Sequence, residues 1–90
     1  MNIELKGTLK IIYAEEKITD SLSVKEIVVT VDVDTQYPQD ISCKAMNAKI
    51  DELESFKMGD SVVVNCNLRG RESKGKYYNQ LLIWSIKKGH

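Results

Sequence analysis

The amino-acid sequence predicts an all-β fold: a five-stranded antiparallel Greek-key barrel with one short helix between strands three and four. Five segments carry apolar residues at alternate positions, which is typical of strands with one buried face. One segment between the third and fourth of these carries apolar residues three positions apart, which is typical of an amphipathic helix. The chain has 90 residues, enough for one domain with one modest core. We therefore expect a single domain spanning residues 1–90.

The first three strands are expected at residues 3–13, 24–33 and 40–46. Gly7 inside the first strand indicates a bulge or a sharp bend, because an interior glycine otherwise weakens a strand. The polar segment 14–23 has no clear period and predicts a loop, and residues 34–39, with the only proline, predict a turn. The residues expected to point inward are Leu5, Leu9 and Ile11 in the first strand, Ile27, Val29, Val31 and Val33 in the second, and Ile41, Cys43 and Ala45 in the third.

The helix is expected at residues 48–57, with Asn47 as its N-cap. The fourth strand follows at 61–71, a glycine-containing hairpin loop at 72–76, and the fifth strand at 77–87. The fifth strand is apolar on both sides from Leu81 to Trp84, and its alternation assigns Trp84 to the core. The residues expected to point inward are Ile50, Leu53 and Phe56 in the helix, Val62, Val64, Cys66 and Leu68 in the fourth strand, and Leu82, Trp84 and Ile86 in the fifth.

This order of elements is that of the OB-fold. The chain resembles a small family of bacterial OB-fold domains of unknown function in the segments ELKGTL (4–9), QYPQDI (36–41), KIDELESFKMGDSVVV (49–64), LRGRESKGKYYNQL (68–81) and WSI (84–86). That family is related to the single-stranded-DNA-binding proteins, which residues 56–81 also resemble directly. The resemblance implies binding of single-stranded DNA with little sequence specificity, a role in DNA replication or repair, and assembly through the first strands. One departure is that the outward positions of strands two and three carry no aromatic residue.

A basic, tyrosine-containing hairpin is the best candidate for holding a nucleic acid. Cations neutralise phosphates and aromatic rings stack on bases, and residues 69–78 combine both kinds of side chain. The alternative is a charged hairpin whose tyrosines merely cover the edge of the barrel. The candidate path consists of Arg69, Arg71, Lys74, Lys76, Tyr77 and Tyr78, with Lys44 and Met46 on the outward face, Tyr37 in the turn after strand two, and Tyr13, Lys17 and Lys25 beside the first loop.

The charges of the chain are balanced in total but divided along its length. There are 13 basic and 13 acidic residues. Residues 1–56 carry six Lys against eleven Asp and Glu, a net charge of −5, whereas residues 57–90 carry seven Lys and Arg against two, a net charge of +5. A neutral total argues against a strong non-specific binder of polyanions but permits a local basic face.

Two functions are therefore compatible with the sequence. The first is a module that binds single-stranded DNA, or alternatively RNA. The second is an OB-fold protein-interaction or assembly module without nucleic-acid binding, which the neutral total charge and the missing outward aromatics favour. In either case we expect a homo-oligomer, a dimer or a tetramer, joined through residues 3–11 or 81–86, because an exposed strand edge is usually covered. A monomer is the alternative.

Other function classes find no support in the sequence. His90 is the only histidine, so no catalytic triad can be built, and neither cysteine has a second cysteine or a histidine at metal-ligand spacing. We therefore expect no enzyme, metal, cofactor or small-molecule substrate. Cys43 and Cys66 lie on the apolar sides of their strands, which predicts two core thiols, with a disulfide as the alternative. No apolar run approaches the about 20 residues that span a bilayer, and no secretory signal is visible, so we expect a cytoplasmic protein.

Overall fold

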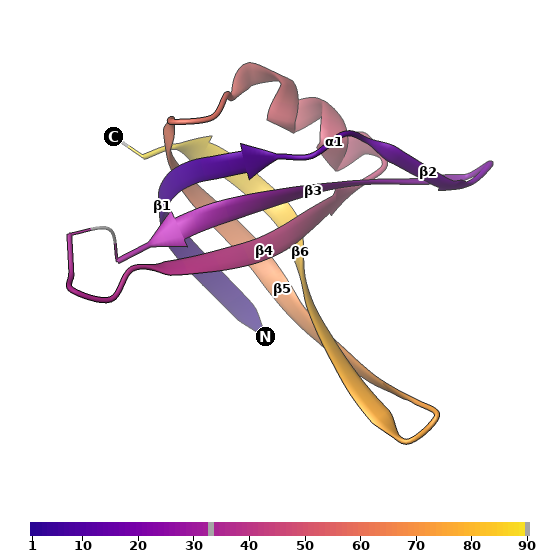
Figure 1. Cartoon of the computed structure of the whole chain (residues 1–90). Helices are drawn as coiled ribbons and strands as arrows, with labels where there is room; N and C mark the ends of the chain where they lie inside the picture. The colour runs from indigo at the N-terminus through magenta and orange to yellow at the C-terminus, as the bar shows by residue number, and fades with distance from the viewer. Residues whose placement is uncertain (33, 90) are drawn as a thin grey trace.

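The computed structural model describes residues 1–32 and 34–89, which form a closed sheet and one helical segment (Figure 1). Val33 and His90, both named in the sequence analysis, lie outside the described residues. The strands of the described part are β1 (Asn2–Ile12), β2 (Glu16–Thr19), β3 (Leu22–Val31), β4 (Gln39–Met46), β5 (Ser61–Ser73) and β6 (Lys76–Lys88). The helical segment between β4 and β5 consists of α1 (Ala48–Glu52) and the short 3₁₀ turn η1 (Leu53–Ser55).

The sheet closes on itself to form the predicted barrel. Its strand order is β1-β5-β6-β4-β3-β2, and β1 also pairs with β3. Every described pairing is antiparallel except the one between β4 and β6, which is parallel and joins Lys44 to Leu82. The five strands β1, β3, β4, β5 and β6 close the barrel, and the helix lies between the third and fourth of them. This is the OB-fold that the sequence predicts.

Strand β1 belongs to both halves of the barrel, and Gly7 lies where the two halves meet. Gly7 pairs with Val31 of β3 on one side and with Val62 of β5 on the other. A Cβ atom at this position would overlap the backbone oxygen of Thr30 and lie 2.8 Å from its carbonyl carbon. The close approach of β1 to β3 therefore requires glycine here, whereas the irregularity of the first strand lies beyond it, between Leu9 and Ile11.

The core follows the predicted alternation in most strands. The inward positions of β3, β4 and the first half of β5 are buried, and Ile50 and Leu53 of the helical segment close one end of the barrel. Phe56 and Ile41 are partly buried against the same core. The buried core residues are Leu5, Leu9, Ile27, Val29, Cys43, Ala45, Ile50, Leu53, Val62, Val64, Cys66, Ile83 and Ile86.

Four expected inward residues, Ile11, Leu68, Leu82 and Trp84, are not in the core. The register between β1 and β3 shifts between Leu9 and Ile11, so that Ile12 packs against the core where Ile11 was expected. The register between β5 and β6 shifts between Asn65 and Cys66, which brings Ile83 into the core in place of Leu82 and leaves Trp84 46% exposed. A bulge inserts one residue into a strand and reverses the inward side beyond it, so simple alternation fails there. Leu68 is 38% exposed because β5 continues past the barrel at this point.

The segment expected to be a loop at residues 14–23 contains strand β2. Glu16 pairs with Val24 and Lys17 with Ser23, so β2 and the start of β3 form a hairpin that projects from the barrel (Figure 1). All four residues of β2 are exposed. Backbone hydrogen bonds define this strand without burial, and a strand without a buried face has no reason to alternate apolar and polar residues.

The helical segment is shorter than expected and starts differently. It ends at Ser55, and the side chain of Asn47 makes no capping hydrogen bond to α1. The Asn47 Oδ1 atom instead accepts a hydrogen bond of 3.0 Å from the backbone N–H of Ser23, and the Asn47 N–H donates one of 3.0 Å to the carbonyl oxygen of Ser23. Asn47 thus fastens the start of the helix to β3.

No helix in the described part of the chain is long and apolar enough to cross a membrane.

Candidate nucleic-acid interface

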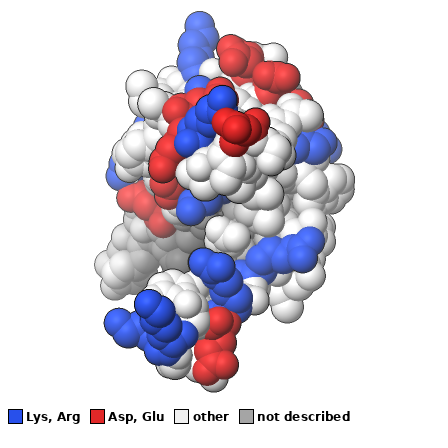
Figure 2. All heavy atoms as spheres, turned by 90° about the vertical axis from the view of Figure 1, so that its right-hand side faces the viewer, with Lys and Arg blue, Asp and Glu red and all other residues white. Residues whose placement is uncertain are grey.

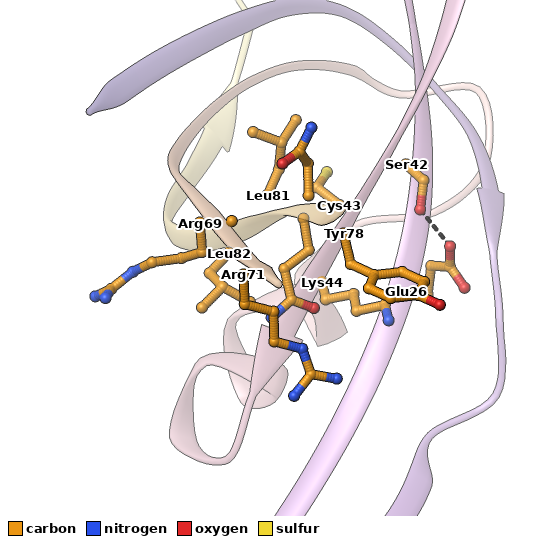
Figure 3. A pocket seen from close by; sticks show the side chains of 12 residues that line it. Glu26, Ser42, Cys43, Lys44, Arg69, Arg71, Tyr78, Leu81 and Leu82 are labelled. Atoms are coloured by element: carbon orange, nitrogen blue, oxygen red, sulfur yellow. Dashed lines mark hydrogen bonds between the residues drawn. The ribbon is translucent and has the colours of Figure 1, made fainter. Parts of the chain in front are cut away.

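A groove of about 600 Å³ lies between the outward face of β3 and β4 and the hairpin formed by β5 and β6 (Figure 3). Four strands contribute to its walls. They supply Glu26 from β3, Ser42, Cys43 and Lys44 from β4, Arg69, Gly70 and Arg71 from β5, and Tyr78, Asn79, Gln80, Leu81 and Leu82 from β6. We call this surface the groove below.

The long β5–β6 hairpin forms one wall of the groove. The two strands pair from Val62 and Lys88 inside the barrel to Ser73 and Lys76 at the tip, so their outer halves extend beyond the other strands (Figure 1). The turn itself is only Lys74 and Gly75, both with positive φ (53° and 80°), as in the tight turns that suit a twisted hairpin. The glycine turn is therefore where the sequence predicts it, within strands that are longer than expected.

The cations of the groove are available to a ligand. Lys44, Arg69 and Arg71 line it, whereas Lys74 and Lys76 lie at the tip of the hairpin. Within residues 1–32 and 34–89, the ion pairs involve other lysines, and none of these five side chains takes part in one. Figure 2 shows that Lys and Arg predominate over the hairpin on the lower part of the displayed face, whereas acidic and basic side chains are mixed on its upper part. The division of charge along the sequence thus becomes a basic region in space.

The expected tyrosines are exposed, but only one of them lines the groove. Tyr78 lies opposite Arg71 in the hairpin and is 50% exposed in the groove wall. Tyr77, its neighbour along the strand, is 77% exposed and does not line the groove. Tyr37 is 73% exposed in the turn between β3 and β4, which lies on the far side of the barrel from the hairpin tip (Figure 1). Tyr78 is therefore the tyrosine on which a base in the groove could stack, and Tyr37 lies outside the groove lining.

The secondary candidates also fall outside the groove. Tyr13 is 47% exposed just after β1, and Met46 is exposed at the end of β4. Lys17 lies on β2, with its ammonium nitrogen 4.0 Å from a carboxylate oxygen of Asp20, and Lys25 lies on β3 opposite Ala45. Of the predicted path, the structure therefore brings together Lys44, Arg69, Arg71 and Tyr78.

Sequence reasoning did not select the polar half of the groove. Glu26 of β3 accepts a hydrogen bond from the hydroxyl of Ser42 on β4 (Figure 3), and the amides of Asn79 and Gln80 on β6 also line the groove. Alternation does place Glu26 and Ser42 on the outward face, but their meeting depends on the register between β3 and β4. A search for cations and aromatic rings does not find these residues, because their side chains are neither cationic nor aromatic.

The two cysteines are buried and free, as predicted for core thiols. A hydrogen bond with the thiol of Cys66, followed by burial, raises the pKa of Cys43 well above its ordinary value. The Cys43 thiol is therefore protonated and unreactive at neutral pH. Nowhere in residues 1–32 and 34–89 do three side chains of His, Cys, Asp or Glu lie together as a metal site would require.

Comparison with known proteins agrees with this fold. Residues 4–87 match the family described as Domain of unknown function (DUF3127), and the chain belongs to this family. No curated protein matches the sequence.

Three solved structures superpose on nearly the whole chain. The first is the mitochondrial single-stranded DNA binding protein Rim1 from S. cerevisiae, with a TM-score of 0.80, 11% identity, and coverage of 98% of this chain and 94% of that one. The second is the single-stranded DNA binding protein SSBb from Mycobacterium smegmatis, with a TM-score of 0.72, 11% identity, and coverage of 97% and 84%. The third is the dimeric N-terminal domain of PriB from Thermoanaerobacter tencongensis, with a TM-score of 0.71, 11% identity, and coverage of 97% and 93%. The chain is thus similar in fold to OB-fold proteins that include single-stranded DNA binding proteins.

Proposed function

We propose that this member of the DUF3127 family is a single domain that binds single-stranded DNA in the groove, without requiring a fixed sequence. The observation that carries the proposal is the set of three cations, Lys44, Arg69 and Arg71, which line one groove beside Tyr78 and take part in no ion pair within the described residues. Cations along a groove neutralise the phosphates of a strand, and an exposed aromatic ring stacks on any base. The similarity in fold to Rim1 and SSBb supports the same assignment.

The proposed role is binding and not catalysis. Single-stranded DNA is exposed when the duplex is opened for replication or repair, so we place the domain in these processes and in the cytoplasm. RNA carries the same phosphates and bases, so a ribonucleotide strand is the natural competitor. A protein that distinguishes the two must contact the 2′-hydroxyl group.

A fluorescence anisotropy titration tests this proposal. The probe is a fluorescein-labelled DNA of mixed sequence and about 16 nucleotides, the upper end of the length that one OB-fold contacts. We expect saturable binding at low salt, and strong weakening when Arg71 and Lys74 are both changed to Glu. Lys57→Glu reverses one charge outside the groove and serves as the control, and an RNA of the same sequence serves as competitor. If the wild-type protein does not bind at low salt, or if the double variant binds equally well, the proposal is wrong.

An assembly module that does not bind nucleic acid is the second candidate. The outward residues of β3 and β4 favour it, since none of them is aromatic, whereas stacking usually contributes about 1–3 kcal/mol per base to single-strand binding. They are Glu26, Val28 and Thr30 on β3 and Ser42, Lys44 and Met46 on β4. The same titration separates the two candidates, because the assembly module predicts no anisotropy change.

We also propose that the domain forms a homo-oligomer, a dimer or a tetramer, through residues 3–11 or 81–86. In the described part of the chain, β1 pairs with β5 over residues 2–8 and with β3 over residues 7–12, and the backbone of Leu9 also bonds to Gly59 and Asp60. The unpaired edges of β1 are therefore residues 2–6 on the β3 side and residues 10–12 on the β5 side. On β6, Trp84 is 46% exposed, and its indole Nε1 donates a hydrogen bond of 2.8 Å to the Oδ1 of Asn2 on β1. Open edges and exposed aromatic rings are usually covered by a partner. Light scattering decides the question, since a mass near the 10.2 kDa of one chain excludes assembly.

A further inference from the structure

A carboxylate lies inside the groove where the proposed function places a polyanion. Glu26 is half-buried on the outward face of β3 and lines the groove together with the three cations. Lys44 is its partner across the β3–β4 ladder, yet the two side chains form no ion pair within the described residues. The carboxylate of Glu26 therefore faces the groove without forming an ion pair with the neighbouring lysine in the described residues.

The position of this carboxylate is held by a hydrogen bond. The hydroxyl of Ser42 donates to one oxygen of Glu26, and in the described residues the other oxygen has no hydrogen-bond partner (Figure 3). An ionised carboxylate accepts hydrogen bonds and donates none. The groove thus presents an oriented acceptor, and a ligand group that meets it must be a donor.

The rest of the groove favours hydrogen bonds to bases over stacking on them. Asn79 and Gln80 add amide groups to its wall, and Tyr78 is the one aromatic residue among its lining side chains. A phosphate is less favourable beside Glu26 than beside the arginines of the opposite wall, so we infer that the part of a bound strand that faces the carboxylate is a base. In a single strand, the Watson–Crick edge of each base is free to be read.

On the basis of the proposed function, we propose that Glu26 selects bases that carry an amino group and disfavours thymine. Cytosine presents the N4 amino group, a donor that a carboxylate accepts. Thymine presents the O4 carbonyl at the same place, and two acceptors facing each other repel. The domain then requires no sequence motif, yet it prefers cytosine-containing over thymine-containing strands at the position next to Glu26.

Oligonucleotides of deoxycytidine and of deoxythymidine, about 16 nucleotides each, test this inference at pH 7.5. Both bases are pyrimidines, and they differ at the edge that Glu26 is proposed to read and in the C5 methyl group of thymine. We expect the wild-type protein to bind the cytosine strand about tenfold more tightly, within the range that one good base contact contributes. Equal binding, or tighter binding of the thymine strand, would overturn the inference.

Variants separate selection by Glu26 from simple charge repulsion. Glu26→Gln keeps the size of the side chain, and its amide can donate to thymine O4 or accept from cytosine N4, so we expect the ratio of the two affinities to fall to about one. Glu72→Gln removes a carboxylate from the β5–β6 hairpin, at a position that does not line the groove. It should raise both affinities equally and leave the ratio unchanged. A ratio that stays at the wild-type value in Glu26→Gln overturns the inference, whereas failure of the wild-type protein to bind either strand overturns the proposed function itself.

Discussion

The salt dependence of binding measures how many cations contact the strand, and Arg71→Ala changes that number by one. Each phosphate neutralised on a single strand contributes about −0.7 to the slope of log affinity against log salt. Three cations line the groove, so the wild-type slope should be about −2.1. Raising the salt fourfold then weakens binding about 18-fold for the wild type, but about sevenfold for Arg71→Ala, whose slope should be about −1.4.

The same measurement decides whether the tip of the hairpin takes part. If Lys74 and Lys76 also contact phosphates, five cations are engaged and the slope should be about −3.5. Anisotropy titrations at four or more salt concentrations give the slope, and Lys57→Ala, outside the groove, serves as the matched loss of one charge. The placement of the strand in the groove is refuted if the slope is the same in the wild type and in Arg71→Ala. It is also refuted if Arg71→Ala and Lys57→Ala reduce the magnitude of the slope equally.

Three further predictions concern the barrel. Gly7→Ala should destabilise the protein by about 3 kcal/mol or more, because the added methyl group overlaps the Thr30 backbone and the strands must separate, and a urea unfolding midpoint equal to the wild type would contradict this. In the folded protein, a hydrogen bond from the Lys88 ammonium group, followed by one from a backbone N–H, holds the pKa of Asp60 below its ordinary value of 3.8. Asp60 therefore stabilises the fold above about pH 4 and loses this contribution as the pH falls further, so thermal melts should show a smaller acid-induced loss of stability for Asp60→Asn than for the wild type. The two core cysteines should react with a thiol reagent only as fast as the barrel opens, and rapid labelling without denaturant would show that they are accessible.

The alternation of residues was sufficient to predict most of the barrel, because burial of one face leaves a period of two in the sequence. It failed at Ile11, Leu82 and Trp84 for one reason. Each lies at or just beyond a bulge, where an added residue reverses the side that points inward, and nothing in the side chains themselves reveals the bulge. Strand β2 was not predicted for a different reason. It is defined by backbone hydrogen bonds and buries no face, so its sequence shows no alternation.

The candidate site was predictable where its residues are close in sequence. Arg69, Arg71 and Tyr78 belong to one hairpin, so a short window of sequence brings them together. Glu26 and Ser42 are 16 residues apart in the sequence and meet only because β3 pairs with β4. Their contact depends on the register of this pairing, which cannot be read from the sequence. Alternation alone therefore identifies the outward face but not which of its residues adjoin the hairpin.

The distribution of charge explains how a chain without net charge can offer a site for a polyanion. The hairpin segment from Arg69 to Lys76 carries four cations and one carboxylate, whereas most acidic residues lie elsewhere on a molecule 39 Å long. At physiological salt, charges more than about 8 Å from the ligand are largely screened, so a strand in the groove experiences the hairpin and not the net charge. The same screening removes long-range attraction, and a single groove with few phosphate contacts would hold a strand weakly.

An oligomer would bring two grooves to the same strand. Once the first groove has bound the strand, the second groove meets it at a raised local concentration, so the overall affinity increases without any new contact within either groove. The proposed oligomer and the proposed single-strand binding are therefore connected, since assembly supplies affinity that three cations in one groove do not.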